Sequence, residues 1–193
     1  MTQFALQRLL EGNRRYVADQ SALDASPSRR SQVAGGQKPF AIVLGCVDSR
    51  VPPELVFNQG LGELFVIRTA GEVLDQAALG SLEFGVEELH IPLLVVLGHQ
   101  RCGAVKAAIE VLDGHGEAGG DIAYLVEALR PAVEHGKRLG GDVWDGAGRA
   151  QAAILVEHLK RSPILSAAIE AGALQVVGAW YSLDTGLAEI IVE

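Results

Sequence analysis

The sequence predicts an α/β fold in which a mostly parallel central sheet is flanked by helices on both faces. Short apolar runs that end in glycine, at 41–45 and 91–98, are typical of buried strands. Stretches with apolar residues at helical spacing separate such runs, and this alternation favours parallel pairing. A short turn at 184–186 divides two strand-like runs, which predicts an antiparallel edge strand at the C-terminus.

The segment 1–36 is expected to form an N-terminal helical arm and a connector. Apolar residues spaced through 4–18, with charges between them, indicate an amphipathic helix. The small polar residues of 21–36 indicate an extended connector. A terminal helix that is joined to the body only by such a connector often packs on another subunit.

The remaining elements follow from similar signals along the chain. Pro52 and Pro53 favour a short helix after Arg50, because proline suits the first turn of a helix. Ser162 and Pro163 likewise cap and start a helix. The sequence therefore predicts strands at 64–67, 174–180 and 187–192, and helices at 75–89, 104–112, 121–135, 148–160 and 163–171.

Composition and charge limit what the chain can do. Its 193 residues are 49% hydrophobic and no Pro/Ser-rich linker divides them, so residues 1–193 are expected to form a single domain. A formal net charge of −8 argues against nucleic acid or an anionic membrane as partner, because both require a clustered basic surface. The absence of a bilayer-length apolar run and of a basic-then-apolar signal region predicts a cytoplasmic protein.

The two cysteines and one of the histidines follow predicted strand ends. Cys46 comes directly after the apolar run 41–45, and His99 and Cys102 follow the run 91–98. Ligands of such sheets gather outside the carboxyl ends of the strands, so these three side chains are expected to converge. Two thiolates and one imidazole are a zinc ligand set that leaves a fourth position open for water or a carboxylate. In a reducing compartment the cysteines are interpreted as ligands rather than as a disulfide.

Asp48 and Arg50 follow Cys46 at alternate positions. If the chain stays extended past Gly45, alternate side chains point the same way, and a thiol, a carboxylate and a guanidinium share one pocket. Taken alone, Asp48 and Arg50 would be interpreted as a structural ion pair that closes the loop. Their place beside a predicted zinc ligand favours a catalytic role.

The pattern Cys46-x-Asp48-x-Arg50-Val51, followed by His99-x-x-Cys102-Gly103, resembles that of the β-class carbonic anhydrases. The resemblance covers most of the chain. It extends through 9–13, Arg68-Thr69-Ala70-Gly71, Gly178-Ala179-Trp180-Tyr181 and Thr185-Gly186. The family's fold places the first and third strands side by side, so the resemblance and the strand pattern imply the same location for the site.

The resemblance implies a reaction, a cofactor and a set of roles. The protein would catalyse the reversible hydration of carbon dioxide to bicarbonate and a proton, with a zinc hydroxide as nucleophile. Cys46, His99 and Cys102 would bind the zinc. Asp48 would orient the hydroxide while Arg50 keeps Asp48 ionised. In an inactive, closed state Asp48 would swing onto the zinc as a fourth ligand.

The resemblance also implies contacts with substrate and with other copies of the chain. Gln37 would donate a hydrogen bond to a substrate oxygen, and Gly103 would belong to the substrate-binding residues. The N-terminal helix and connector would embrace a partner protomer, which implies a homodimer or a dimer of dimers.

One departure from the family pattern concerns regulation. Some bacterial members carry an inhibitory bicarbonate site built from a Trp, an Arg and a Tyr. Arg68 and Tyr181 stand in the matching places, but Val43 stands where the Trp would be. We therefore predict that bicarbonate does not switch this protein off.

Three alternatives stay open on the sequence alone. The same zinc site could hydrolyse carbonyl sulfide or carbon disulfide, because relatives with this site act on those linear molecules and pocket shape decides between them. A zinc-stabilised interaction module without activity would need a permanent fourth ligand, and only Asp48 is available. A redox dithiol is least favoured, because the cysteines lack Cys-x-x-Cys spacing.

Overall fold

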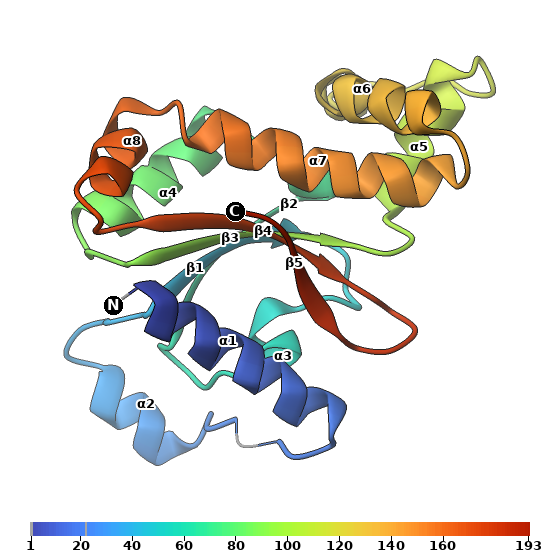
Figure 1. The fold of residues 1–193 in the computed structure, drawn as a ribbon. Coiled ribbons are helices and arrows are strands. Elements are labelled where there is room, and N and C mark those ends of the chain that lie inside the picture. The colour runs from blue at the N-terminus through green and yellow to red at the C-terminus, as the bar shows by residue number, and fades with distance from the viewer. Residues whose placement is uncertain (1, 22) are drawn as a thin grey trace.

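A five-stranded sheet runs through the molecule in the order β2-β1-β3-β4-β5 (Figure 1). The computed structural model describes residues 2–21 and 23–193. The strands are β1 (Ala41–Cys46), β2 (Leu64–Thr69), β3 (Leu93–His99), β4 (Gln175–Tyr181) and β5 (Ala188–Val192). The first four are parallel, and β5 pairs antiparallel with β4. The predicted sheet with its antiparallel edge strand is confirmed.

Helices cover both faces of this sheet (Figure 1). One face carries α4 (Gln76–Glu87), α7 (Val143–Leu159) and α8 (Pro163–Glu170). The other face carries α1 (Thr2–Val17) and α3 (Pro53–Val56). Beyond the carboxyl ends of the strands, α5 (Gly103–Leu112) and α6 (Ile122–Leu139) pack against α7. None of the helices within residues 2–21 and 23–193 has the length and apolar character needed to cross a membrane.

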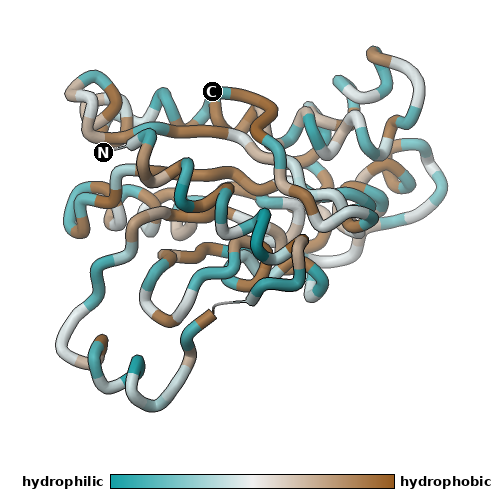
Figure 2. The backbone as a smooth tube through the Cα atoms, turned by 60° about the horizontal axis from the view of Figure 1, so that its bottom comes forward, coloured by the Kyte–Doolittle hydropathy of each residue, from teal (hydrophilic) through white to brown (hydrophobic). Residues whose placement is uncertain are grey.

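The strands supply two hydrophobic cores, one on each face of the sheet. Ile42 and Leu44 of β1 pack on the side of α4, α7 and α8, whereas Ala41 and Val43 pack on the side of α1 and α3. All four side chains are fully buried. Burial of a Leu or Ile side chain contributes about 2 kcal/mol. This two-sided burial explains why the strands are continuous hydrophobic runs, coloured brown through the middle of the molecule in Figure 2.

The N-terminal helix α1 packs on its own chain. Leu9 is fully buried in the core beneath the sheet. Asn13, also buried, donates to the carbonyls of Val56 and Gly186 and accepts from the amide of Ala188. The helix is therefore fixed to the body by direct contacts, which corrects the expectation of a helix joined only through the connector.

The connector at 21–36, expected to be extended, contains a short helix, α2 (Pro27–Val33). Ser26 caps this helix by accepting a hydrogen bond from the amide of Arg29, and Pro27 occupies its first turn. The expectation of an extended segment is wrong, because Ser26 and Pro27 form a helix start signal among the small polar residues. Position 22 of the connector lies outside the described residues.

The other predicted helices and strands are present, with shifted ends. The helix α7 begins at Val143 rather than at Gly148, because the Asp142 carboxylate accepts from the amides of Trp144 and Asp145 and caps the helix earlier. The helix α6 likewise continues past 135 to 139. These shifts lengthen the two helices that pack beside the carboxyl ends of the strands.

Candidate metal centre

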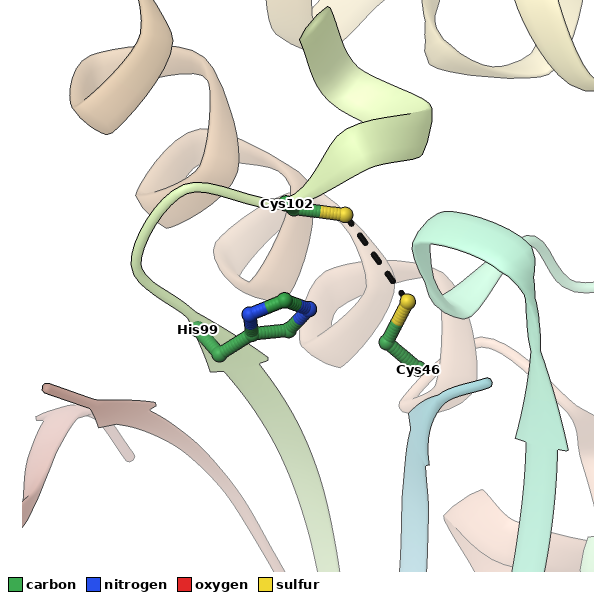
Figure 3. Close-up of side chains that lie close together, drawn as sticks. All are labelled: Cys46, His99 and Cys102. Carbon is green, nitrogen blue, oxygen red and sulfur yellow. Dashed lines mark hydrogen bonds between the residues drawn. The ribbon is translucent and has the colours of Figure 1, made fainter. Parts of the chain in front are cut away.

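The carboxyl ends of β1 and β3 bring the predicted ligands to one point (Figure 3). Cys46 is the last residue of β1, His99 is the last residue of β3, and these strands pair in parallel. Cys102 is the cap residue at the start of α5. The chain leaves β1 toward α3 on one face and leaves β3 toward α5 on the other. Such divergence opens the crevice in which α/β proteins commonly bind their ligands.

The three side chains form a compact, buried cluster. One ligand atom from each lies within 4.8 Å of the other two, and the two sulfur atoms are 3.8 Å apart. The exposed fractions of Cys46, His99 and Cys102 are 3%, 1% and 2%. In the described part of the chain, no other group of three His, Cys, Asp or Glu side chains has this spacing. Two sulfurs and one imidazole nitrogen are a donor set that suits zinc.

The imidazole of His99 is oriented for coordination. Its Nδ1 lies 2.9 Å from the carbonyl oxygen of Gln100, so Nδ1 carries the proton and donates it. The lone pair of Nε2 is then free, and this buried atom has no hydrogen-bond partner. Leaving a buried acceptor unpaired costs about 1–3 kcal/mol. A cation at the cluster would remove that cost, so the residues present fit a metal ion.

The two thiols share a proton. The hydrogen bond from Cys102 is the main cause that lowers the pKa of Cys46 to about 4, and His99 and the amide of Gly71, 3.4 Å from the Cys46 sulfur, lower it further. The same contact between the sulfurs, together with burial, raises the pKa of Cys102. The two opposite shifts mean that one proton stays on the pair of sulfurs at neutral pH. A metal that binds both sulfurs has one thiol proton to displace.

Asp48 and Arg50 form a close ion pair beside the cluster. Arg50 Nε and Nη2 donate to Asp48 Oδ1 and Oδ2 at 2.9 and 2.7 Å, and the Arg50 amide donates to Oδ1 at 2.9 Å. The chain turns here instead of staying extended, because an Asp side chain readily accepts from an amide two residues on. The Asp48 and Arg50 side chains therefore meet because the chain turns, and not because alternate side chains of an extended chain point the same way. The Arg50 hydrogen bonds lower the pKa of Asp48 to about 2, so the carboxylate is ionised at neutral pH.

Two further contacts fix the loop that carries Asp48. Arg68, in β2, donates to the carbonyls of Cys46 and Asp48 at 2.7 and 2.6 Å. Arg50 Nη2 also donates to the carbonyl of Arg101 at 3.1 Å. Hydrogen bonds from a charged donor are roughly twice as strong as neutral ones. The loop and its carboxylate are therefore held from both neighbouring strand ends.

Three residues near the cluster were not predicted from the sequence. Trp144 Nε1 donates to the Cys102 carbonyl at 2.7 Å, and buried Gln151 donates to the Gly71 carbonyl at 3.2 Å. Buried Glu72 has a left-handed φ of 55° and one carboxylate oxygen without a partner, and burial, followed by the charge of Cys46, raises its pKa. Trp144 and Gln151 reach the site from α7, and no local sequence pattern signals a contact over that separation.

The two residues predicted to bind substrate lie in different places. Gly103 is the first residue of α5, and a Cβ added there would meet no atom within 4 Å, so there is open space beside it. Gln37 is exposed and precedes β1, at the amino end of the sheet. The structure therefore does not bring Gln37 to the cluster of its own chain. A cavity of about 960 Å³ also opens at that amino end, away from the cluster.

Comparison with known proteins identifies the family. The family model described as "Carbonic anhydrase" matches residues 41–188, which include the whole cluster. The solved structure of a Coccomyxa β-carbonic anhydrase in complex with acetazolamide superposes with a TM-score of 0.77 at 33% identity, covering 97% of this chain and 86% of that one. The chain belongs to the β-carbonic anhydrase family.

Two further proteins show how far the similarity extends. Carbonic anhydrase 2 of Mycobacterium tuberculosis is 44% identical over 186 residues, which cover 95% of this chain and 90% of the relative. A structure from the study of two tetrameric β-carbonic anhydrases of Sordaria macrospora superposes with a TM-score of 0.78 at 22% identity, covering 86% and 87% of the two chains. The fold is thus kept where most of the sequence differs.

Proposed function

We propose that this protein is a zinc enzyme that catalyses the reversible hydration of carbon dioxide to bicarbonate and a proton. The observation that carries the proposal is the buried cluster of Cys46, His99 and Cys102, in which His99 Nε2 lacks a partner. Membership of the family, and 44% identity to a protein named carbonic anhydrase, support this reaction.

We assign zinc to the cluster, held by the two sulfurs and by His99 Nε2. Three protein ligands leave a fourth position open, as in catalytic zinc sites and unlike the closed sites of zinc-stabilised modules. When bound, zinc supplies the Lewis acidity that makes water a nucleophile near neutral pH. The protein's own residues then have to hold substrate and nucleophile in line.

Asp48 is proposed to orient the attacking water. Its carboxylate is ionised, because Arg50 lowers its pKa to about 2, and it can accept a hydrogen bond from that water. Alignment of nucleophile and substrate is a large source of rate enhancement. Arg50 engages both carboxylate oxygens and so keeps Asp48 in one orientation. Once released by Arg50, Asp48 would turn to the cluster as its fourth ligand and close the site.

The remaining substrate contacts are proposed to require a second copy of the chain. Gln37 lies at the amino end of β1, away from the cluster of its own chain. In a homodimer or a dimer of dimers, Gln37 of one protomer could enter the site of the other and donate to a substrate oxygen. The Sordaria macrospora proteins, which share the fold, are tetrameric. Gly103, with open space beside it, would line the same pocket.

A stopped-flow hydration assay on zinc-quantified protein tests this function. We expect about one zinc per chain, consistent with one three-ligand site, and rapid hydration that is lost when the metal is removed. Zinc-loaded protein that does not hydrate carbon dioxide would contradict the proposal. Sulfide release from carbonyl sulfide or carbon disulfide, measured on the same preparation, would reveal the other reaction that this ligand set supports.

Regulation and location are further proposals. Val43 is packed in the core beneath the sheet, Arg68 is engaged with two backbone carbonyls of the site loop, and the Tyr181 hydroxyl lies 3.3 Å from that of Tyr16. We therefore propose that bicarbonate does not inhibit cooperatively, and a steep, sigmoidal loss of rate with added bicarbonate would contradict this. A cytoplasmic location stays a prediction of the sequence.

A further inference from the structure

A second ion pair lies beside the site. Arg101, in the loop between β3 and α5, donates from Nη1 and Nη2 to the two carboxylate oxygens of Asp184 at 3.0 and 2.7 Å. Asp184 belongs to the turn between β4 and β5. The neighbouring Gln100 joins the same two segments, because its amide donates to the Tyr181 carbonyl at 2.9 Å and its side-chain oxygen accepts from Ser182 at 3.3 Å. The loop is thus fastened to the turn.

The backbone of Arg101 contacts the Asp48–Arg50 pair. Arg50 Nη2 donates both to the Arg101 carbonyl, at 3.1 Å, and to Asp48 Oδ2, at 2.7 Å. Arg101 has a φ of 54°, in the left-handed region, which a side chain of this size adopts only where its surroundings hold it. The bridge to Asp184 is such a restraint. The bridge thus restrains Arg101, whose carbonyl accepts a hydrogen bond from Arg50.

The turn that carries Asp184 is itself anchored. Asn13 of α1, which is 1% exposed, donates to the Gly186 carbonyl at 2.9 Å and accepts from the Ala188 amide at 2.9 Å. Breaking such bonds would leave buried polar groups unpaired, which is costly. Asp184 therefore stands on a fixed support rather than on a free loop.

We propose that Arg101 and Asp184 are positioning residues for the Asp48–Arg50 pair. Their bridge holds the Arg101 carbonyl where it accepts from Arg50, and Arg50 in turn holds the Asp48 carboxylate in its working orientation. Without the bridge the loop relaxes from its left-handed conformation, and Arg50 loses one of its acceptors. The inference rests on the proposed function, because it assigns a role within that site.

Replacing either partner by its uncharged analogue tests this link. We expect Arg101→Gln and Asp184→Asn each to lower kcat for hydration about fivefold, with KM and zinc content unchanged. The double variant should be no slower than either single variant, because both substitutions remove the same contact. Asp184→Glu, which keeps a carboxylate, should recover most of the rate. Single effects that add in the double variant would overturn the proposal.

The Glu127–Arg130 pair on α6 is a matched control. Arg130 also donates twice to one carboxylate, at 2.9 and 2.6 Å. The exposed fractions of the Arg130 and Glu127 side chains are 44% and 62%, close to the 43% and 59% of Arg101 and Asp184. Arg130→Gln and Glu127→Gln should leave kcat unchanged. A loss of kcat equal to that of Asp184→Asn would indicate a general effect of surface charge and would overturn the proposal.

Hydrogen exchange supplies a readout that needs no turnover. In the zinc-loaded protein, NMR should show slow exchange of the Arg50 Nε–H, which donates to Asp48, and faster exchange in Arg101→Gln and Asp184→Asn. Exchange at the wild-type rate in both variants would overturn the inference. Zinc-loaded wild-type protein that fails to hydrate carbon dioxide would instead contradict the proposed function, and the exchange rates would still test the contacts.

Discussion

The two ends of the parallel strands carry opposite kinds of chemistry. At the carboxyl ends, thiol and imidazole groups converge in a buried cluster, with an Asp–Arg ion pair beside it. At the amino ends, a cavity of about 960 Å³ is lined mainly by apolar residues, among them Phe40, Ile91 and Ile164. Two histidines illustrate the contrast: His99 ends β3 and is buried, whereas His90 lies just before β3 and is exposed.

This difference shows that chain topology decides where reactive side chains can gather. β1 and β3 are neighbours, but the chain continues from them to opposite faces of the sheet. The backbone therefore separates at the carboxyl ends and leaves room for side chains between the two connections. His90 and Lys38 instead line the mainly apolar cavity at the amino ends, and among the described residues neither belongs to a cluster of metal-binding side chains. Substitutions that pair one residue from each end test this contrast.

The largest expected effect comes from removing a ligand. His99→Ala should lose zinc and lower hydration by on the order of 10³-fold or more, because the nucleophile depends on the metal. His90→Asn, which lies just before the start of the same strand, should keep both its zinc and its hydration rate. Asn is chosen because His90 has a left-handed φ of 53°. Elemental analysis and stopped-flow rates check the pair, and full zinc occupancy in His99→Ala would refute the ligand assignment.

The next effect concerns orientation rather than metal binding. Arg50→Ala should lower turnover about 100-fold, because a misplaced Asp48 no longer aligns the nucleophile. Zinc content should stay nearly intact, since Arg50 touches none of the ligand atoms through a hydrogen bond. Lys38→Ala removes a cation at the amino ends and should change neither quantity. Metal-free Arg50→Ala protein would speak against this division of roles.

The shared proton predicts how zinc affinity depends on pH. In the metal-free protein the contact between the sulfurs lowers the pKa of Cys46 and raises the pKa of Cys102, so the pair keeps one proton that zinc must displace. Affinity should therefore rise with pH, about tenfold per unit between pH 7 and 8. Competition with a chelator at the two pH values measures this slope. A hundredfold change would mean that two protons leave and that both thiols are protonated beforehand.

The smallest expected effect concerns the open space beside Gly103. A methyl group there meets no atom within 4 Å, so Gly103→Ala should keep its zinc and change the free energy of unfolding by less than about 0.5 kcal/mol. It should raise KM about two- to threefold, the small cost of crowding a pocket by one methyl group. Ala167→Leu places a larger side chain in the cavity at the amino ends and should leave KM unchanged. Equal KM values in both variants and the wild type would argue against Gly103 lining the substrate pocket.

Much of the fold and of the site could be predicted because the signals are local. An apolar run that ends in glycine predicts both a buried strand and the place where it ends, so the sequence places Cys46 and His99 at strand ends, as the structure does. The pairing of Asp48 with Arg50 was also expected, but its geometry was not. The sequence predicts an extended chain past Gly45, but the Asp48 side chain accepts a hydrogen bond from the Arg50 amide and the chain turns.

The parts that could not be predicted involve residues far apart in the chain. Trp144 reaches the Cys102 carbonyl from α7, and Asp184 reaches Arg101 from the turn between β4 and β5. Neither contact leaves a periodic pattern near the site, because each depends on how separate elements pack. The exposed position of Gln37 at the amino end of β1 is likewise a consequence of strand direction.

The kind of sheet, the strand ends and the three candidate metal donors can be read from the sequence alone, because hydrophobic periodicity and side-chain chemistry are properties of short segments. The folded structure was needed to show that the two thiols hold one proton, how Asp48 is held, and that Gln37 lies at the opposite end of the sheet from the cluster. These depend on distances of a few ångströms between segments that meet only when the chain is folded, and at such distances hydrogen bonding and burial decide the charge of each group.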